Sequence, residues 1–104
     1  MYNWLMYEST DIAMRPVTIF TTVDETVRAI ADICKKFGAE AWLFGSQARG
    51  TARKGSDIDI AVRSSQFDDV EEALEEIDTV FIIDVVDLSQ PHVKGVDDAR
   101  IRIA

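Results

Sequence analysis

The chain has 104 residues, which is enough for one compact domain and too few for two. Hydrophobic residues make up 47% of it and no low-complexity tract is present, so the composition excludes disorder for most of the chain. A formal charge of -8 disfavours long nucleic acid as a partner, and the apolar runs are too short to span a bilayer.

We expect no secretion signal in the N-terminal residues. Residues 1–15 include acids and lack a continuous apolar core, and the single cysteine, Cys34, cannot form an internal disulfide. We therefore expect a cytoplasmic protein. Residues 1–20 have no clear hydrophobic period and are predicted as an N-terminal extension, whereas residues 21–104 are predicted as the functional domain.

The first element after this extension is a helix from Val23 to Phe37. Thr22 and Glu25 have the spacing of a capping box, apolar residues then recur at helical intervals, and Gly38 ends the pattern. Cys34 lies on the apolar stripe, which predicts a buried side chain and not a catalytic thiol. The run 41–44 follows as a short buried strand that leads into a tight turn at Gly45-Ser46.

The second half of the chain alternates strands and a helix. Residues 58–62 are predicted as a strand, 69–77 as an acidic amphipathic helix, and 80–88 as a third strand rich in Val and Ile. The tail is predicted to be helical from Val96. This order indicates an α/β (α+β) protein, with a small mixed sheet and helices packed mainly on one face.

Two aspartates in the second strand carry the first chemical signal. Side chains alternate along a strand, so Asp57 and Asp59 share one face and stand about 7 Å apart. Between them Ile58 points the other way, into the core. Two neighbouring carboxylates repel each other unless a cation is shared between them, and hard oxygen ligands suit Mg²⁺, with Mn²⁺ as the alternative.

The Gly45-Ser46 turn carries the second signal. Where a strand ends and a helix begins, free backbone N–H groups favour a phosphate, and a glycine lets the backbone approach it closely. Ser46 adds a hydroxyl donor. Arg49 lies one helical turn further on, where it either binds a phosphate or ties the turn to an aspartate; the sequence leaves both roles open.

Together these segments resemble the signature of the polymerase-beta nucleotidyltransferase superfamily, in particular its minimal nucleotidyltransferase (MNT) group of the MntA-like antitoxin type. The signature is Gly-Ser-x-Ala-Arg-Gly, a short basic loop, and then Ser-Asp-x-Asp followed by a hydrophobic residue. The matching positions are Gly45, Ser46, Arg49, Gly50, Ser56, Asp57 and Asp59. The resemblance extends from about residue 23 to residue 88 and implies a polymerase-beta-like fold for the domain.

The resemblance also implies a chemistry. In such proteins two Mg²⁺ ions held by the paired aspartates, here Asp57 and Asp59, clamp a nucleoside triphosphate, while the Gly45-Ser46 turn grips its outer phosphates. A third carboxylate on a neighbouring strand binds the metal nearest the acceptor. Asp84 and Asp87 have opposite parity, so a regular strand cannot turn both toward the site, and the family pattern favours Asp84.

For the acceptor, the resemblance favours a protein. Proteins of this group resemble the antitoxin half of HEPN/MNT pairs, which moves AMP from ATP to a HEPN toxin, commonly to a tyrosine. Two alternatives stay open: nucleotidyl transfer to a small molecule such as an aminoglycoside, and a non-catalytic module that masks its toxin. The acidic surface agrees with a protein acceptor and no membrane, and a homo-oligomer is also left open.

Overall fold

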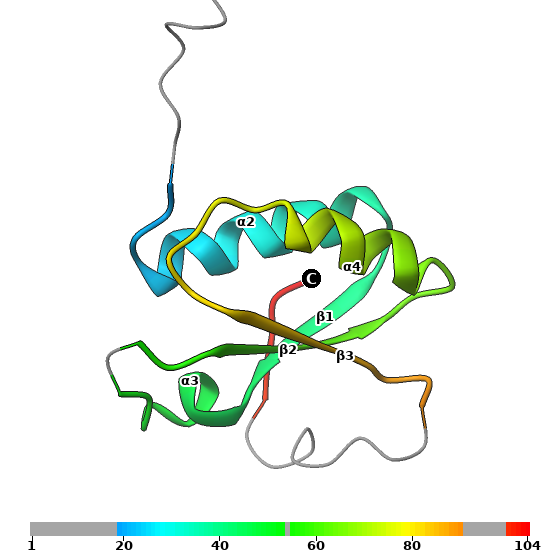
Figure 1. Cartoon of the computed structure of the whole chain (residues 1–104). Helices are drawn as coiled ribbons and strands as arrows, with labels where there is room; N and C mark the ends of the chain where they lie inside the picture. The colour runs from blue at the N-terminus through cyan, green and yellow to red at the C-terminus, as the bar shows by residue number, and fades with distance from the viewer. Residues whose placement is uncertain (1–18, 54, 91–99) are drawn as a thin grey trace, which may run out of the picture.

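The computed structural model describes residues 19–53, 55–90 and 100–104. Three helices and four strands occur in these ranges (Figure 1). In chain order they are α2 (Val23–Lys36), β1 (Glu40–Phe44), α3 (Gly45–Arg49), β2 (Ile58–Arg63), α4 (Phe67–Glu75), β3 (Ile83–Asp87) and β4 (Ile101–Arg102). No helix among the described residues is both long and apolar enough to cross a membrane.

The four strands form one mixed sheet in the order β3-β2-β1-β4. β1 runs antiparallel to both β2 and β4, whereas β3 runs parallel to β2 after a crossover through α4. The register places Phe44 opposite Asp59 on one side, and Asp59 beside Asp84 on the other. The predicted mixed sheet is therefore confirmed.

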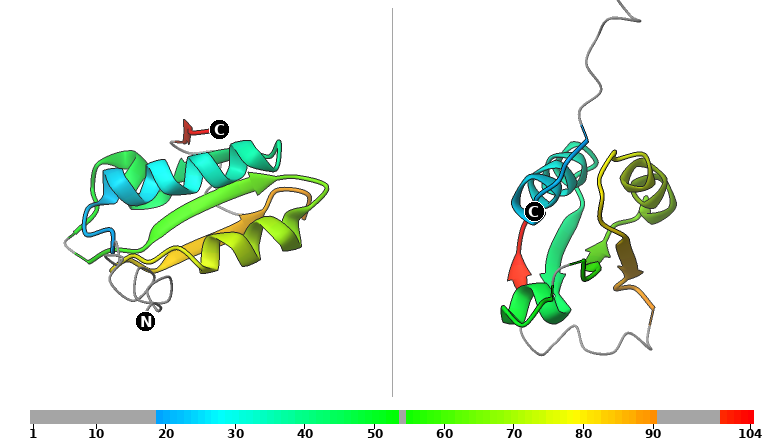
Figure 2. Two further views of the ribbon diagram at one scale, coloured as in Figure 1. Left: turned by 90° about the horizontal axis from the view of Figure 1, so that it is seen from above. Right: turned by 60° about the vertical axis from the view of Figure 1, so that its left-hand side comes forward.

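Helices α2 and α4 lie side by side over one face of the sheet, as Figures 1 and 2 show. The core between these two layers takes the alternate residues of each strand. Its fully buried members include Ile30 and Leu74 from the helices and Ile58, Ile60 and Val62 from β2. In the part of the chain that is described, no helix longer than α3 covers the opposite face, which we call the open face.

The helix α2 begins at the predicted residue and ends one residue before the predicted end, at Lys36. The backbone N–H of Glu25 donates to the Thr22 hydroxyl at 3.2 Å, and the same hydroxyl donates to the Glu25 carboxylate at 3.0 Å. Its C-cap is Phe37, and Gly38 follows with a φ of 66°. Cys34 is fully buried, and this burial raises the pKa of its thiol to about 11, so a catalytic thiolate is excluded at neutral pH.

Three expectations about the second half need correction. The helix expected over 69–77 spans Phe67–Glu75 instead. The strand expected from Val80 begins only at Ile83, where the register with β2 starts. Val80 and Ile82 are 62% and 64% exposed, and Ile82 contributes only its carbonyl, which accepts from the N–H of Ile58 at 2.9 Å. The tail ends in the strand β4 and not in a helix, although residues 96–99 of the expected helix lie outside the described residues.

A small polar network ties the start of the described chain to the core. Phe20 forms a parallel bridge to Thr79, and its N–H donates to the carbonyl of Asp78 at 2.8 Å. The hydroxyl of Thr79 lies 2.8 Å from that of Thr26, whose side chain is fully buried and donates to the Thr22 carbonyl. The division of the chain at residue 20 stays a prediction, since residues 1–18 lie outside the described residues.

Candidate active site

Three aspartates meet on the open face. Asp59 in β2 stands directly beside Asp84 in β3, and both have the parity opposite to the buried Ile58 and Ile60. Asp57 precedes β2 and lies within hydrogen-bonding reach of the Asp84 carboxyl group. The structure therefore brings together the two aspartates of the motif and the one aspartate of β3 that was favoured for the site.

The three carboxyl groups influence one another electrostatically. Loss of hydration on burial raises the pKa of Asp59 most, and the charges of Asp84 and Asp57 raise it further, whereas the charge of Arg49 opposes the shift. The pKa of Asp84 is also raised, first by loss of hydration and then by its hydrogen bond with Asp57 and the charge of that residue. Negative charge is thus concentrated here at an energetic cost.

The Gly45 backbone lies against one of these aspartates. Its φ of 72° is in the left-handed region, which only glycine adopts without a penalty. A Cβ atom placed on Gly45 would overlap Oδ2 of Asp59 and would come within 3.2 Å of its Cγ. Glycine is therefore favoured here for two reasons, namely its backbone conformation and the contact with Asp59.

The turn and the short helix α3 follow β1 directly. Figure 1 shows α3 at the far end of β1, apart from α2 and α4. The first N–H groups of any helix have no acceptor within the helix, and this applies to those of Gly45 and Ser46 in α3. Arg49 is exposed and forms no ion pair with Asp57 or Asp59 among the described residues, although its charge acts on Asp59.

The loop between α3 and β2 is held by Ser56. Its hydroxyl accepts a hydrogen bond from the N–H of Arg53 at 2.9 Å, and its own N–H donates to the Arg53 carbonyl at 2.9 Å. The side-chain amide of Gln47 reaches the Ser56 carbonyl at 3.5 Å. In the sequence, Ser56 is only one position of the motif. In the structure, its hydrogen bonds hold the backbone immediately before Asp57 in place.

The donor set is chemically suited to divalent cations of the Mg²⁺ type. Carboxylate oxygens are hard ligands. The pKa values of Asp59 and Asp84 are raised first by loss of hydration and then by the neighbouring carboxylates, whose repulsion a shared cation would relieve. Among the residues that the structure describes, no three acidic, histidine or cysteine side chains are already arranged as a metal-binding group. The fit therefore rests on the chemistry and mutual repulsion of the carboxylates, and the roles of the individual residues stay predictions.

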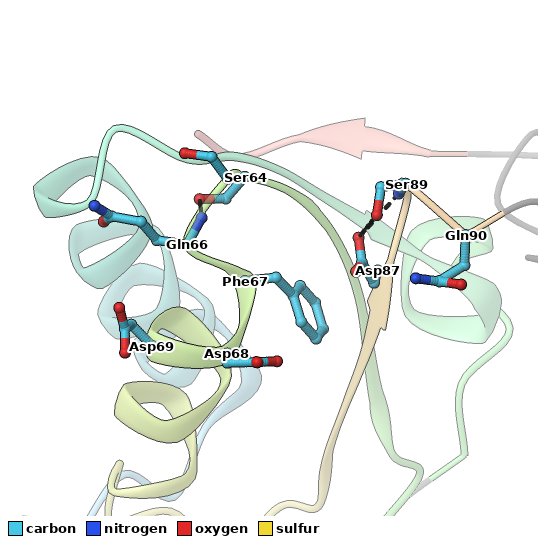
Figure 3. Close-up of a pocket in the computed structure, with 9 residues that line it drawn as sticks. Ser64, Gln66, Phe67, Asp68, Asp69, Asp87, Ser89 and Gln90 are labelled. Carbon is cyan, nitrogen blue, oxygen red and sulfur yellow. Dashed lines mark hydrogen bonds between the residues drawn. The ribbon is translucent and has the colours of Figure 1, made fainter.

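Asp87 lies elsewhere. It has the opposite parity in β3, and its Oδ1 accepts hydrogen bonds from the N–H and the hydroxyl of Ser89 at 2.9 and 2.8 Å. These bonds lower the pKa of its carboxyl group. Figure 3 shows Asp87 and Ser89 lining an open hollow opposite Phe67 and the first turn of α4. None of the three clustered aspartates lines this hollow.

The fold and the motif define the class of protein. A four-stranded mixed sheet covered by two helices, with the glycine turn after β1, is the polymerase-beta-like nucleotidyltransferase fold. The chain belongs to the nucleotidyltransferase domain family, whose model matches residues 27–97. No curated protein matches the chain significantly.

One solved structure supports the fold. It is described as the crystal structure of a toxin-antitoxin with AMP-PNP, and one of its chains is 23% identical to this protein, with a TM-score of 0.52. The match covers 75% of this chain and 72% of that chain.

Proposed function

We propose that this protein moves AMP from ATP to a hydroxyl group of a partner protein in a reaction that depends on Mg²⁺. The observation that carries the proposal is the meeting of Asp57, Asp59 and Asp84 on the open face, beside the Gly45 turn. Membership of the nucleotidyltransferase family supplies the reaction class.

Each part of the site has a role in this proposal. Asp57 and Asp59 would hold two Mg²⁺ ions, and Asp84 would share the ion nearest the acceptor. The N–H groups of Gly45 and Ser46 would bind the outer phosphates of ATP, with Arg49 adding positive charge. Bound divalent ions would stabilise negative charge on the attacked phosphoryl group and lower the pKa of the acceptor hydroxyl.

The transfer is a displacement at one phosphorus atom. The acceptor oxygen forms a bond to the α-phosphorus, and the bond from this phosphorus to the oxygen that bridges to the β-phosphate breaks. Pyrophosphate leaves with that electron pair. Asp84, which would share the ion nearest the acceptor, is the proposed acceptor of the hydroxyl proton.

The partner we propose is a HEPN-family toxin, with a tyrosine as the acceptor residue, so that the protein is an antitoxin of the MntA-like type. Support comes from the fold shared with a chain of a toxin-antitoxin crystallised with AMP-PNP. The net charge of -8 agrees with a protein acceptor, since it would repel a nucleic acid.

The test uses ATP labelled on its α-phosphate. The protein is incubated with this ATP, Mg²⁺ and the product of the adjacent gene, and both proteins are then examined for the added mass of AMP. We expect label on the partner. Asp59→Asn should abolish the transfer without unfolding the protein, whereas Asp87→Asn, the same change outside the aspartate cluster, should retain it.

Three outcomes contradict the proposal. Unchanged transfer by Asp59→Asn would remove the assigned mechanism. Label that appears only on this chain would indicate self-modification and not an antitoxin. Inhibition of the partner's activity without any ATP would favour the masking module, in which binding alone neutralises the partner.

A further inference from the structure

Three arginines gather on the open face around a tryptophan. Trp42 has the opposite parity to the core residues Ala41 and Leu43, so its ring lies on the helix-free side of the sheet. The guanidinium carbons of the arginines each lie 5.1 Å from the centroid of this ring, and the ring is shielded because Trp42 is only 6% exposed. We refer to Trp42, Arg63, Arg100 and Arg102 as the Trp42 cluster.

Two arginines of the cluster share one carboxylate, that of Glu40. Its Oε1 lies 2.7 Å from Nε of Arg63, and its Oε2 lies 3.2 Å from Nη2 of Arg102. The side chains of Arg63 and Arg102 are still 59% and 57% exposed. Arg63 and Arg102 thus share one negative charge, on a chain whose net charge is -8.

The cluster and the aspartates lie on the same face, a short distance apart. Trp42 is paired with Ala61, and Phe44 is paired with Asp59 two positions further along. Arg63 follows Asp59 by four residues on the same strand, which corresponds to about 13 Å. An extended peptide segment of about four residues therefore spans the distance between the arginines and the aspartates.

We propose that the Trp42 cluster binds an acidic segment of the acceptor protein. Guanidinium groups bind carboxylates through paired hydrogen bonds, and the exposed arginines provide positive charge where the rest of the surface is mainly acidic. The next step rests on the proposed function. When the acidic side chains of the segment bind the arginines, a hydroxyl about four residues further along the segment reaches Asp84. The substrate class is therefore a protein segment with acids about four residues from the modified residue.

Binding is tested without nucleotide, so that it does not depend on transfer. The probes are a short fluorescent peptide with one tyrosine and a run of glutamates, and a copy with glutamines in their place. The glutamate peptide should bind at least about tenfold more tightly, and added salt should weaken its binding. Equal binding of the two peptides, or no binding of either, would overturn the proposal.

Glu40→Gln provides a sharper test, because it removes the acid that offsets the arginines. This variant should bind the glutamate peptide about threefold or more tightly than the wild type does. Glu72→Gln makes the same change in charge on the exposed side of α4 and should leave the affinity unchanged. Equal affinities of Glu40→Gln and Glu72→Gln would contradict the assigned surface.

The double variant Arg63→Gln with Arg102→Gln should lose the preference for the glutamate peptide. Its matched control is Lys35→Gln with Lys36→Gln, at the end of α2, which should keep the preference. Thermal melts establish that each variant folds, and if the arginine variant does not, the Glu40→Gln comparison still decides. Tighter binding of a single-stranded DNA oligonucleotide than of the glutamate peptide would replace the protein acceptor with a nucleic acid.

The two proposals fail separately. If ATP with Mg²⁺ does not raise the melting temperature of the wild-type protein, the proposed transfer is wrong, and the peptide measurements still decide the Trp42 cluster. If ATP with Mg²⁺ stabilises the protein but neither peptide binds, the transfer proposal stands and the acidic acceptor segment is wrong.

Discussion

Replacing Gly45 by alanine should affect this protein in a way that separates backbone strain from contact with the aspartate. Gly45 and Gly50 have the same φ of 72°, but a Cβ on Gly50 meets no atom within 4 Å, whereas one on Gly45 overlaps Asp59. Left-handed backbone costs a residue with a Cβ about 1–2 kcal/mol, and this applies at both positions. Displacing the Asp59 carboxylate should add about 1–3 kcal/mol at Gly45 alone.

The assay is denaturant and thermal unfolding followed by circular dichroism, without nucleotide or metal. Each kcal/mol corresponds to about 4–8 °C in melting temperature for a domain of this size. In a background of Asp59→Ala, the overlap is relieved and the cost of Gly45→Ala should fall to that of Gly50→Ala. Equal costs for the two glycine variants in the wild-type background would refute this account of the turn.

Two further predictions concern β3 and the Thr79 network. Asp84→Asn should raise the free energy of unfolding in metal-free buffer at neutral pH, because lost hydration and the neighbouring Asp57 raise the pKa of Asp84. Asp87→Asn should lower it, because hydrogen bonds from Ser89 lower the pKa of Asp87. A raised pKa means that ionised Asp84 destabilises the folded state, so the advantage of Asp84→Asn should vanish as the pH falls below the ordinary carboxyl range. The stability that ionised Asp87 contributes should also be lost as the pH falls through that range. Unfolding curves from pH 7 to pH 3 check both signs, and the same sign for the two variants at neutral pH would be inconsistent with this assignment. Thr79→Val should cost about 1–2 kcal/mol, because the buried Thr26 hydroxyl loses one partner; an unchanged free energy of unfolding would count against the network.

Much of the fold was predictable because local signals agreed with one another. The capping pair Thr22 and Glu25 and the following Gly38 predicted α2 to within one residue of its observed end. The alternation around Ile58 and Ile60 predicted which side of β2 is buried. Each of these signals depends on residues close together in the sequence, where hydrogen bonding and burial leave few alternatives.

The errors arose where pairing between distant segments decides the structure. Val80 and Ile82 have strand-like composition, yet both are exposed and precede the ladder. The strand β4 has only two residues, Ile101 and Arg102, and exists because it pairs with Leu43 and Trp42. A segment this short has no hydrophobic period of its own, so no sequence pattern predicts it.

The sequence predicted which residues belong to the candidate site, but it did not predict the contacts between them. Strand alternation placed Asp57 and Asp59 on one face, and the resemblance to the superfamily selected Asp84. The contact between Gly45 and Asp59 depends on the register between β1 and β2 and on the φ of the glycine, and neither can be read from residue spacing. The Trp42 cluster depends on β4, which the sequence did not reveal.

The most direct test of the central claim is a crystal structure of the protein with Mn²⁺ and a non-hydrolysable ATP analogue, in which anomalous scattering locates the ions. The account predicts ions bound by Asp57, Asp59 and Asp84, with the outer phosphates on the backbone of Gly45 and Ser46. Ions bound instead in the hollow beside Asp87, or phosphates remote from the Gly45 turn, would contradict it.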